Sequence, residues 1–229
     1  MNIFKAFKSL TKFELLLWIV SMIVVAASFL VTENGDVLTL TASLIGVTSL
    51  IFLARGFAFG QVLMIVFSTI YGIISFRFSY YGEMLTYVGM TLPMAVVSLV
   101  SWIRHPYKKS AEVEVSKLNK KKIVFLILSS VAVTVACYFI LKAFNTANLV
   151  PSTISVLTSY IAATLTAFRS PYYALGYAAN DIVLIVLWVL AATEDFSYLP
   201  MVMCFAVFFF NDMYGFICWK KMEKRQKKQ

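Results

Sequence analysis

The sequence predicts an all-α membrane protein with about eight transmembrane helices: an N-terminal helix, then two parallel three-helix bundles joined by a linker helix. Three observations lead to this fold class. Of the 229 residues, 61% are hydrophobic and 14% are charged, whereas about 25% of the residues in soluble domains are charged. Eight segments approach the roughly 20 apolar residues that a membrane span needs. The basic residues fall almost entirely in alternate connections.

The eight apolar segments follow one another through connections that are mostly a few residues long, so successive helices should be antiparallel neighbours. They cover residues 13–31, 37–53, 57–76, 84–103, 123–143, 149–168, 172–192 and 198–219. The predicted organisation is an N-terminal helix in 1–36, a first three-helix bundle in 37–103, a basic cytoplasmic loop in 104–122, a linker helix in 123–144, a second three-helix bundle in 149–219 and a basic cytoplasmic tail in 220–229.

The distribution of charge predicts the orientation. With a cytoplasmic N-terminus, all but two of the 20 lysine and arginine residues face the cytoplasm, as the positive-inside rule requires. The outer connections carry acidic residues instead, namely Glu33, Asp36, Glu83, Glu194 and Asp195. We therefore predict that both termini are cytoplasmic and that the chain resides in a bacterial inner (cell) membrane. The net charge of +9 then needs no nucleic acid partner, because anionic lipid headgroups explain it.

The two bundles are predicted to be a repeat. Both begin outside and end inside, so they are related by an axis along the membrane normal. Arg55 matches Arg169 in the first inner turn, and Trp102 matches Trp219 before a basic run. The segment 13–31 either pairs with 123–143 in a four-plus-four arrangement or is a peripheral addition, and the sequence leaves both options open.

Few residues could carry enzymatic chemistry. His105, the only histidine, lies in the inner loop, and the chain has no GxSxG, HExxH, Walker or Gly-rich dinucleotide motif. Cys137, Cys204 and Cys218 lie in apolar segments without CxxC spacing, which argues against disulfides and metal sites. We therefore expect no catalytic residue, no metal and no cofactor.

Two polar pairs, Asn180-Asp181 and Asn211-Asp212, interrupt otherwise apolar spans. A carboxylate at membrane depth costs about 2.5 to 3.5 kcal/mol, so such a residue usually faces the bundle interior or a wet cavity. Each aspartate lies about 12 to 15 Å from the inner end of its helix, so the two pairs should share a depth near the midplane. In each pair, one residue could face the cavity while the other bonds a neighbouring helix. Two alternative roles remain open for these pairs. They could only hold neighbouring helices together through hydrogen bonds, or the two aspartates could belong to an intramembrane hydrolase.

Aromatic residues accompany these polar groups. Trp188 shares a helix face with Asn180, and Tyr177 lies about one turn below. Ring faces beside acceptors are what a flat heterocycle bearing a ribose requires, although simple core packing explains any single ring equally well. Tyr87 and Gln61 are expected to complete the wall from the first bundle, where Pro93 permits a kink.

The chain resembles the PnuC family of Pnu vitamin transporters. The resemblance rests on 180–188 (NDIVLIVLW), on 211–219 (NDMYGFICW) and on 82–91 (GEMLTYVGMT). It implies a SWEET-like fold and facilitated uptake of nicotinamide riboside by alternating access, with cytoplasmic phosphorylation trapping the substrate for NAD biosynthesis. Asn180 and Asn211 match membrane-embedded asparagines of the family that would bind the ligand.

The chain departs from the family at Gly176, where members often carry tryptophan, and this departure leaves thiamine, riboflavin and deoxynucleosides as alternative substrates. Proton coupling through Asp181 or Asp212 is the alternative mechanism, and a membrane-embedded enzyme or signalling subunit is the alternative class. The sequence does not determine whether the chain forms a homo-oligomer. The predicted substrate-binding residues are Asn180, Asn211, Asp212, Trp188, Tyr177, Tyr87, Gln61 and Asp181.

Overall fold

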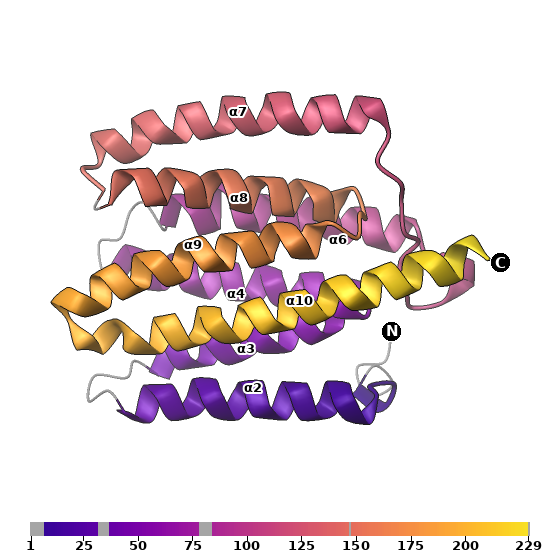
Figure 1. Ribbon diagram of the computed structural model, residues 1–229, viewed down its shortest axis with the longest axis horizontal. Helices are drawn as coiled ribbons and strands as arrows, with labels where there is room; N and C mark the ends of the chain where they lie inside the picture. The colour runs from indigo at the N-terminus through magenta and orange to yellow at the C-terminus, as the bar shows by residue number, and fades with distance from the viewer. Residues whose placement is uncertain (1–6, 32–36, 78–83, 147, 229) are drawn as a thin grey trace.

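The computed structural model describes residues 7–31, 37–77, 84–146 and 148–228. Eight helices in these ranges are long and apolar enough to cross a membrane, which confirms the predicted fold class (Figure 1). They are α2 (Lys12–Val31), α3 (Val37–Ala54), α4 (Ala58–Arg77), the π-helix η1 (Leu85–Thr91) with its continuation α6 (Leu92–Arg104), α7 (Lys120–Ala143), α8 (Leu149–Ala167), α9 (Tyr173–Glu194) and α10 (Leu199–Lys227), which follows the short 3-10 turn η3 (Phe196–Tyr198).

Six of these helices form a closed ring. In each bundle the second helix packs against the first and the third, so α4 lies between α3 and α6, and α9 lies between α8 and α10. The third helix of each bundle packs against the first helix of the other, which gives two equivalent seams, α6 on α8 and α10 on α3. The middle of this ring is the place where a cavity can form.

The helices α2 and α7 lie outside the ring, at opposite edges of the molecule (Figure 1). Each packs against the first helix of the bundle that follows it, and α2 also packs against α10. The outer face of α7 presents apolar side chains, among them Leu128, which is 66% exposed. Exposed apolar surface of this kind suits contact with lipid. The two outer helices therefore have corresponding places, as a four-plus-four arrangement expects.

The helix predicted for residues 84–103 changes type along its length. It begins as η1, in which the N–H of Leu92 donates to the carbonyl oxygen of Tyr87, five residues earlier. Pro93 follows directly and has no N–H to donate. The expected irregularity at Pro93 is thus a wide helical turn just before it, and such π segments often lie at functional sites.

The inner turns of the two bundles share one geometry. Gly56 has a φ of 67° and Arg169 a φ of 59°, the left-handed conformation that commonly ends a helix. The N–H of Gly56 donates to the oxygen of Leu53 at 2.9 Å, and the N–H of Arg169 donates to that of Thr166 at 2.9 Å. Arg169 therefore corresponds to Gly56. The predicted match with Arg55 is wrong by one residue, because the left-handed position sets the register.

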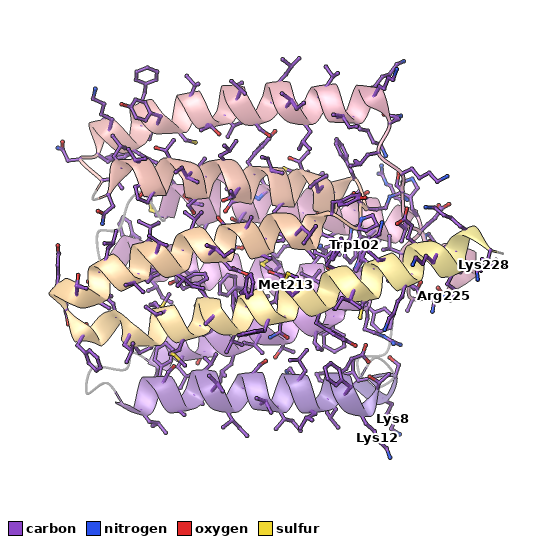
Figure 2. The ribbon with its side chains drawn as sticks, in the orientation of Figure 1. Lys8, Lys12, Trp102, Met213, Arg225 and Lys228 are labelled. Carbon is purple, nitrogen blue, oxygen red and sulfur yellow. The ribbon has the colours of Figure 1, made fainter. Side chains whose placement is uncertain are left out.

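One end of the bundle is basic. Figure 2 shows Lys8, Lys12, Arg225 and Lys228 at the end where α2 starts and α10 finishes. We call this the basic end, and we call the end with the α7–α8 and α9–α10 connections the far end. Four residues used to predict the orientation lie outside the described residues: Lys5, Glu33, Asp36 and Glu83.

Candidate functional site

A cavity of about 560 Å³ lies inside the six-helix ring, a size that suits a small-molecule ligand. It reaches from mid-depth to the far end, where Asn145, Glu194 and Tyr198 line it. Three carboxylates, Asp181, Asp212 and Glu194, are among its walls, and no lysine, arginine or histidine is among the described residues that line it. The cavity is therefore suited to neutral or cationic ligands and unfavourable for anions.

Six of the eight predicted binding residues line this cavity: Asn180, Asp181, Asp212, Trp188, Tyr177 and Tyr87. Asn211 and Gln61 do not. The amide nitrogen of Asn211 donates to Ser21 Oγ on α2 at 2.9 Å and to the oxygen of Val207 at 2.8 Å. Gln61 is only 2% exposed, and its Nε2 has no partner among the described residues. In the pair Asn211-Asp212, one residue thus faces the cavity and the other holds a neighbouring helix, whereas both residues of Asn180-Asp181 line the cavity.

Asn180 is held by the neighbouring helix α8. Its Oδ1 accepts from Ser155 Oγ at 3.2 Å, Thr158 Oγ1 at 2.9 Å and Ser159 Oγ at 3.0 Å. None of these contacts uses the amide nitrogen, which is left to donate to a ligand. Buried amides fixed in this way present one group in one direction, which favours specific recognition.

Asp181 and Asp212 both line the cavity, and they are 3% and 5% exposed. Both carboxyl groups therefore belong to the wall of the same cavity. Asp181 Oδ2 is buried and has no partner among the described residues.

The aromatic walls lie at different depths. Tyr177 and Trp188 are eleven residues apart on α9, a separation of about 16 Å along the helix. Trp188 packs near the far end against Tyr198, with a centroid distance of 5.5 Å. From the first bundle, Tyr87 contacts Tyr71 at 4.5 Å. One small heterocycle cannot stack on Tyr177 and Trp188 at once, so these rings serve different parts of a ligand or of its path.

The sequence reasoning missed several lining residues. Ser152, Ser155 and Ser159 of α8 face the cavity, as do Thr86 and Thr91 of η1. The three serines follow the spacing i, i+3, i+7, which places them on one helix face. This polar stripe on one face of the helix is the sequence signal that could have identified them as lining residues.

The cavity is closed toward the basic end by two tryptophans. Trp102, labelled in Figure 2, donates from Nε1 to the oxygen of Thr166 at 2.9 Å. Trp219 donates from Nε1 to the oxygen of Leu53 at 2.8 Å. Their rings are 5.3 Å apart, and Tyr173 packs against Trp219 at 4.9 Å. Each bundle thus bonds the inner turn of the other, and we call this arrangement the tryptophan closure.

The loop that precedes α7 reinforces this end. The N–H of Val113 donates to the oxygen of Gly56 at 2.9 Å, and the N–H of Ser116 donates to the oxygen of Arg169 at 3.0 Å. Gln226 of α10 accepts from the N–H of Val115 at 2.8 Å. Burial lowers the pKa of the Arg169 guanidinium, and the negative charge of the nearby Glu114 opposes that shift.

The ring of helices around a polar cavity, closed at one end, defines a membrane transporter for a small solute. The sequence model of the family described as "Nicotinamide mononucleotide transporter" matches residues 36–221. The chain therefore belongs to this family, which is the PnuC family predicted from the sequence.

Two relatives support this assignment. The chain is 24% identical over 225 residues to the nicotinamide riboside transporter PnuC of Neisseria mucosa, in an alignment that covers 96% of this chain and 85% of the relative. Its structure is similar to the crystal structure of the vitamin B3 transporter PnuC, with a TM-score of 0.81, 22% identity, and coverage of 95% of this chain and 94% of that chain. The second likeness shows the shared fold.

Proposed function

We propose that this protein transports nicotinamide riboside across a bacterial inner membrane, with its basic end in the cytoplasm. The observation that carries the proposal is the cavity lined by Asn180, Asp181 and Asp212 and free of lysine, arginine and histidine among its described walls. The riboside offers a positively charged ring, an amide and sugar hydroxyls. A mononucleotide would add a phosphate that faces carboxylates with no cation to balance it, so the cavity favours the riboside.

Each lining group has a proposed role. Asn180 donates from its amide nitrogen, while Asp181 and Asp212 accept hydrogen bonds and balance the charge of the ring. Tyr177 and Tyr87 contact the ligand at mid-depth, and Trp188 contacts it nearer the far end. The two predicted residues outside the cavity, Asn211 and Gln61, serve helix packing in this proposal.

The proposed mechanism is alternating access by facilitated diffusion. With the tryptophan closure intact, the cavity reaches only the far end. Rocking of the two bundles about the α6–α8 and α10–α3 seams would break the two tryptophan bonds and open the basic end. A cytoplasmic kinase would then trap the riboside as its phosphate, which keeps uptake running downhill.

Thermal stabilisation of the purified protein tests the substrate. Nicotinamide riboside should raise the melting temperature, because a ligand that binds only the folded state stabilises it. Thiamine, riboflavin, deoxynucleosides and nicotinamide mononucleotide should have little effect. If one of those compounds stabilises the protein and the riboside does not, the substrate proposed here is wrong.

Counterflow in proteoliposomes without a pH gradient tests the mechanism. Labelled riboside should exchange under these conditions, since no coupling ion is required. Exchange that occurs only with an imposed proton gradient would establish proton coupling instead. A protein that binds the riboside but never moves it would point to the enzyme or signalling class.

A further inference from the structure

The part of the cavity at the far end, which we call the mouth, has an aromatic and acidic wall on α9. Trp188, Ala191 and Glu194 all line the cavity there, and their spacing of three residues keeps them along one side of the helix. Trp188 and Glu194 are six residues apart, or about 9 Å along the helix. Ala191 between them adds only a methyl group. The indole ring and the carboxylate therefore border the same part of the cavity.

The other groups at the mouth complete a site for a flat cation. Tyr198 packs against Trp188 with ring centroids 5.5 Å apart. Asn145 and Asn148 line the cavity from the connection between α7 and α8, at the same end of the molecule (Figure 1). Both have a positive φ, of 50° and 53°, which asparagine adopts more readily than most residues. Aromatic faces attract cations, a carboxylate balances their charge, and amides bond hydroxyls.

The mouth and the mid-depth site are too far apart to hold one small ligand together. Asn180 and Glu194 are fourteen residues apart on α9, about 21 Å along the helix, so a nucleoside that contacts Asn180 does not reach Glu194. Glu194 is exposed and Trp188 is half-buried, whereas Asn180 is 6% exposed. Solvent weakens the contacts of exposed charges. The mouth therefore suits the brief capture of a ligand, and mid-depth suits its firm binding.

We propose that Trp188, Glu194 and Tyr198 form an outer capture site, which binds N-substituted pyridinium nucleosides at the mouth before they pass to mid-depth. This inference rests on the proposed function and adds a second site to it. The carboxylate attracts the cation from a distance, and the rings contact its flat face. No basic residue is among the described residues that line the cavity, so no lining charge opposes this attraction.

A capture site on the path has a kinetic signature. Glu194 stabilises the cation as it crosses the mouth, and this crossing is common to entry and exit. Removing the charge should therefore slow association and dissociation by the same factor. The dissociation constant Kd of the mid-depth complex should stay the same, because it depends only on the free and the bound states. Loss of a group that contacts the bound ligand would raise Kd instead.

The experiment follows the association and dissociation of radiolabelled nicotinamide riboside by rapid filtration with the purified full-length protein at neutral pH. At an ionic strength of about 20 mM, Glu194→Gln should lower both rate constants about fivefold and keep Kd within about twofold of the wild type. At about 300 mM salt the difference should fall below about twofold, because ions screen the carboxylate. Trp188→Leu, which removes a ring face, should lower both rate constants about threefold.

Asp195→Asn is the matched control. It removes one negative charge from the position next to Glu194, and Asp195 is not among the residues that line the cavity. Asp195 Oδ1 accepts from the N–H of Ser197 at 2.9 Å, and an asparagine oxygen can accept in the same way. Both rate constants of this variant should therefore stay within about twofold of the wild type.

The possible results separate the capture site from the transport proposal. Equal slowing in Glu194→Gln and Asp195→Asn would show a general field at this end and overturn the capture site. Unchanged rate constants in Glu194→Gln or in Trp188→Leu would overturn it as well, and so would a higher Kd with unchanged association. All of these results leave the transport proposal standing. A wild-type protein that does not bind nicotinamide riboside contradicts the proposed function itself.

Discussion

The two bundles have the same scaffold but different chemistry at mid-depth. Counting from the equivalent residues Gly56 and Arg169, Met64 and Phe67 of α4 correspond to Tyr177 and Asn180 of α9, and all four line the cavity. The repeat therefore fixes which of these positions face the cavity, while the residue types make the wall apolar on α4 and polar on α9.

The carboxyl pair has no counterpart in the first bundle. The position of Asp181 is occupied there by Ser68, and counting back from the matched tryptophans, the position of Asp212 is occupied by Ala95. The difference teaches that a repeated scaffold provides the shape and the closure, whereas one bundle alone provides charge. A cavity with carboxyl groups from only one bundle suits a ligand that is itself asymmetric, with a ring at one end and a sugar at the other.

The largest effect is expected where the bundles differ in helix spacing. Gly176 of α9 corresponds to Leu63 of α4, and a Cβ at Gly176 would lie 2.9 Å from the Cα of Ala162. Gly176→Leu, which installs the residue of the first bundle, should cost about 3 kcal/mol through overpacking and lower the Tm by about 10 °C. Gly215→Ala is the control, because its added Cβ would lie 3.7 Å from its nearest neighbours. An equal Tm for Gly176→Leu and the wild type would show that α8 and α9 can separate freely.

The next effect tests the polar wall directly. Asn180→Leu should weaken the binding of nicotinamide riboside about 100-fold, because it removes the proposed ligand contact and takes away the acceptor of the Ser155 and Ser159 hydroxyls. Phe67→Leu, at the equivalent position of the first bundle, should change the affinity less than about fivefold. Both affinities can be measured by calorimetry. Similar losses in the two variants would contradict the division into a polar and an apolar wall.

A smaller effect tests the feature that the bundles share. Trp102→Phe and Trp219→Phe each remove one hydrogen bond and keep a ring, at a cost of about 1 kcal/mol. Each should lower the Tm by about 2 to 4 °C, by the same amount because the two positions are equivalent. Since the rings touch, the double variant should depart from additivity. A loss confined to one tryptophan would show that the closure is not reciprocal.

The smallest effect concerns the loop before α7. Gln226→Ala removes the side chain that accepts from the N–H of Val115 and donates to Glu112 and to the oxygen of Val113. We expect a Tm lower by about 2 °C and unchanged affinity for nicotinamide riboside. Lys228→Ala, at an exposed position two residues later, is the control. A change in affinity with Gln226→Ala alone would couple this loop to the cavity.

The sequence predicted the helices closely, because a span must satisfy a length and a polarity that can be counted. The same counting placed Asp181 and Asp212 near mid-depth, and both line the cavity. It could not determine which way each polar residue points, since the rotation of a helix depends on its neighbours. Asn180 and Asn211 each precede an aspartate, yet one lines the cavity and the other bonds Ser21 on α2.

The contacts made by the loop of residues 104–122 also could not be predicted from the sequence. Its lysines and arginine predicted a basic connection, whereas Val113 is buried, with 1% exposure, against the first inner turn. That burial depends on the shape of a turn far away in the chain. The one-residue error at Arg55 has the same origin, since the left-handed residue that sets the register is Gly56 in one bundle and Arg169 in the other.

The contact between Gln226 and the backbone of Val113 also has a consequence for biosynthesis. The loop leaves the ribosome long before α10 has been made, so the first inner turn must wait for both Trp219 and Gln226. The closure of the basic end is therefore complete only after the last helix has been inserted. A nascent chain that stops before α10 lacks Trp219 and Gln226, so it can form the bond of Trp102 to Thr166 but not the bond of Trp219 to Leu53.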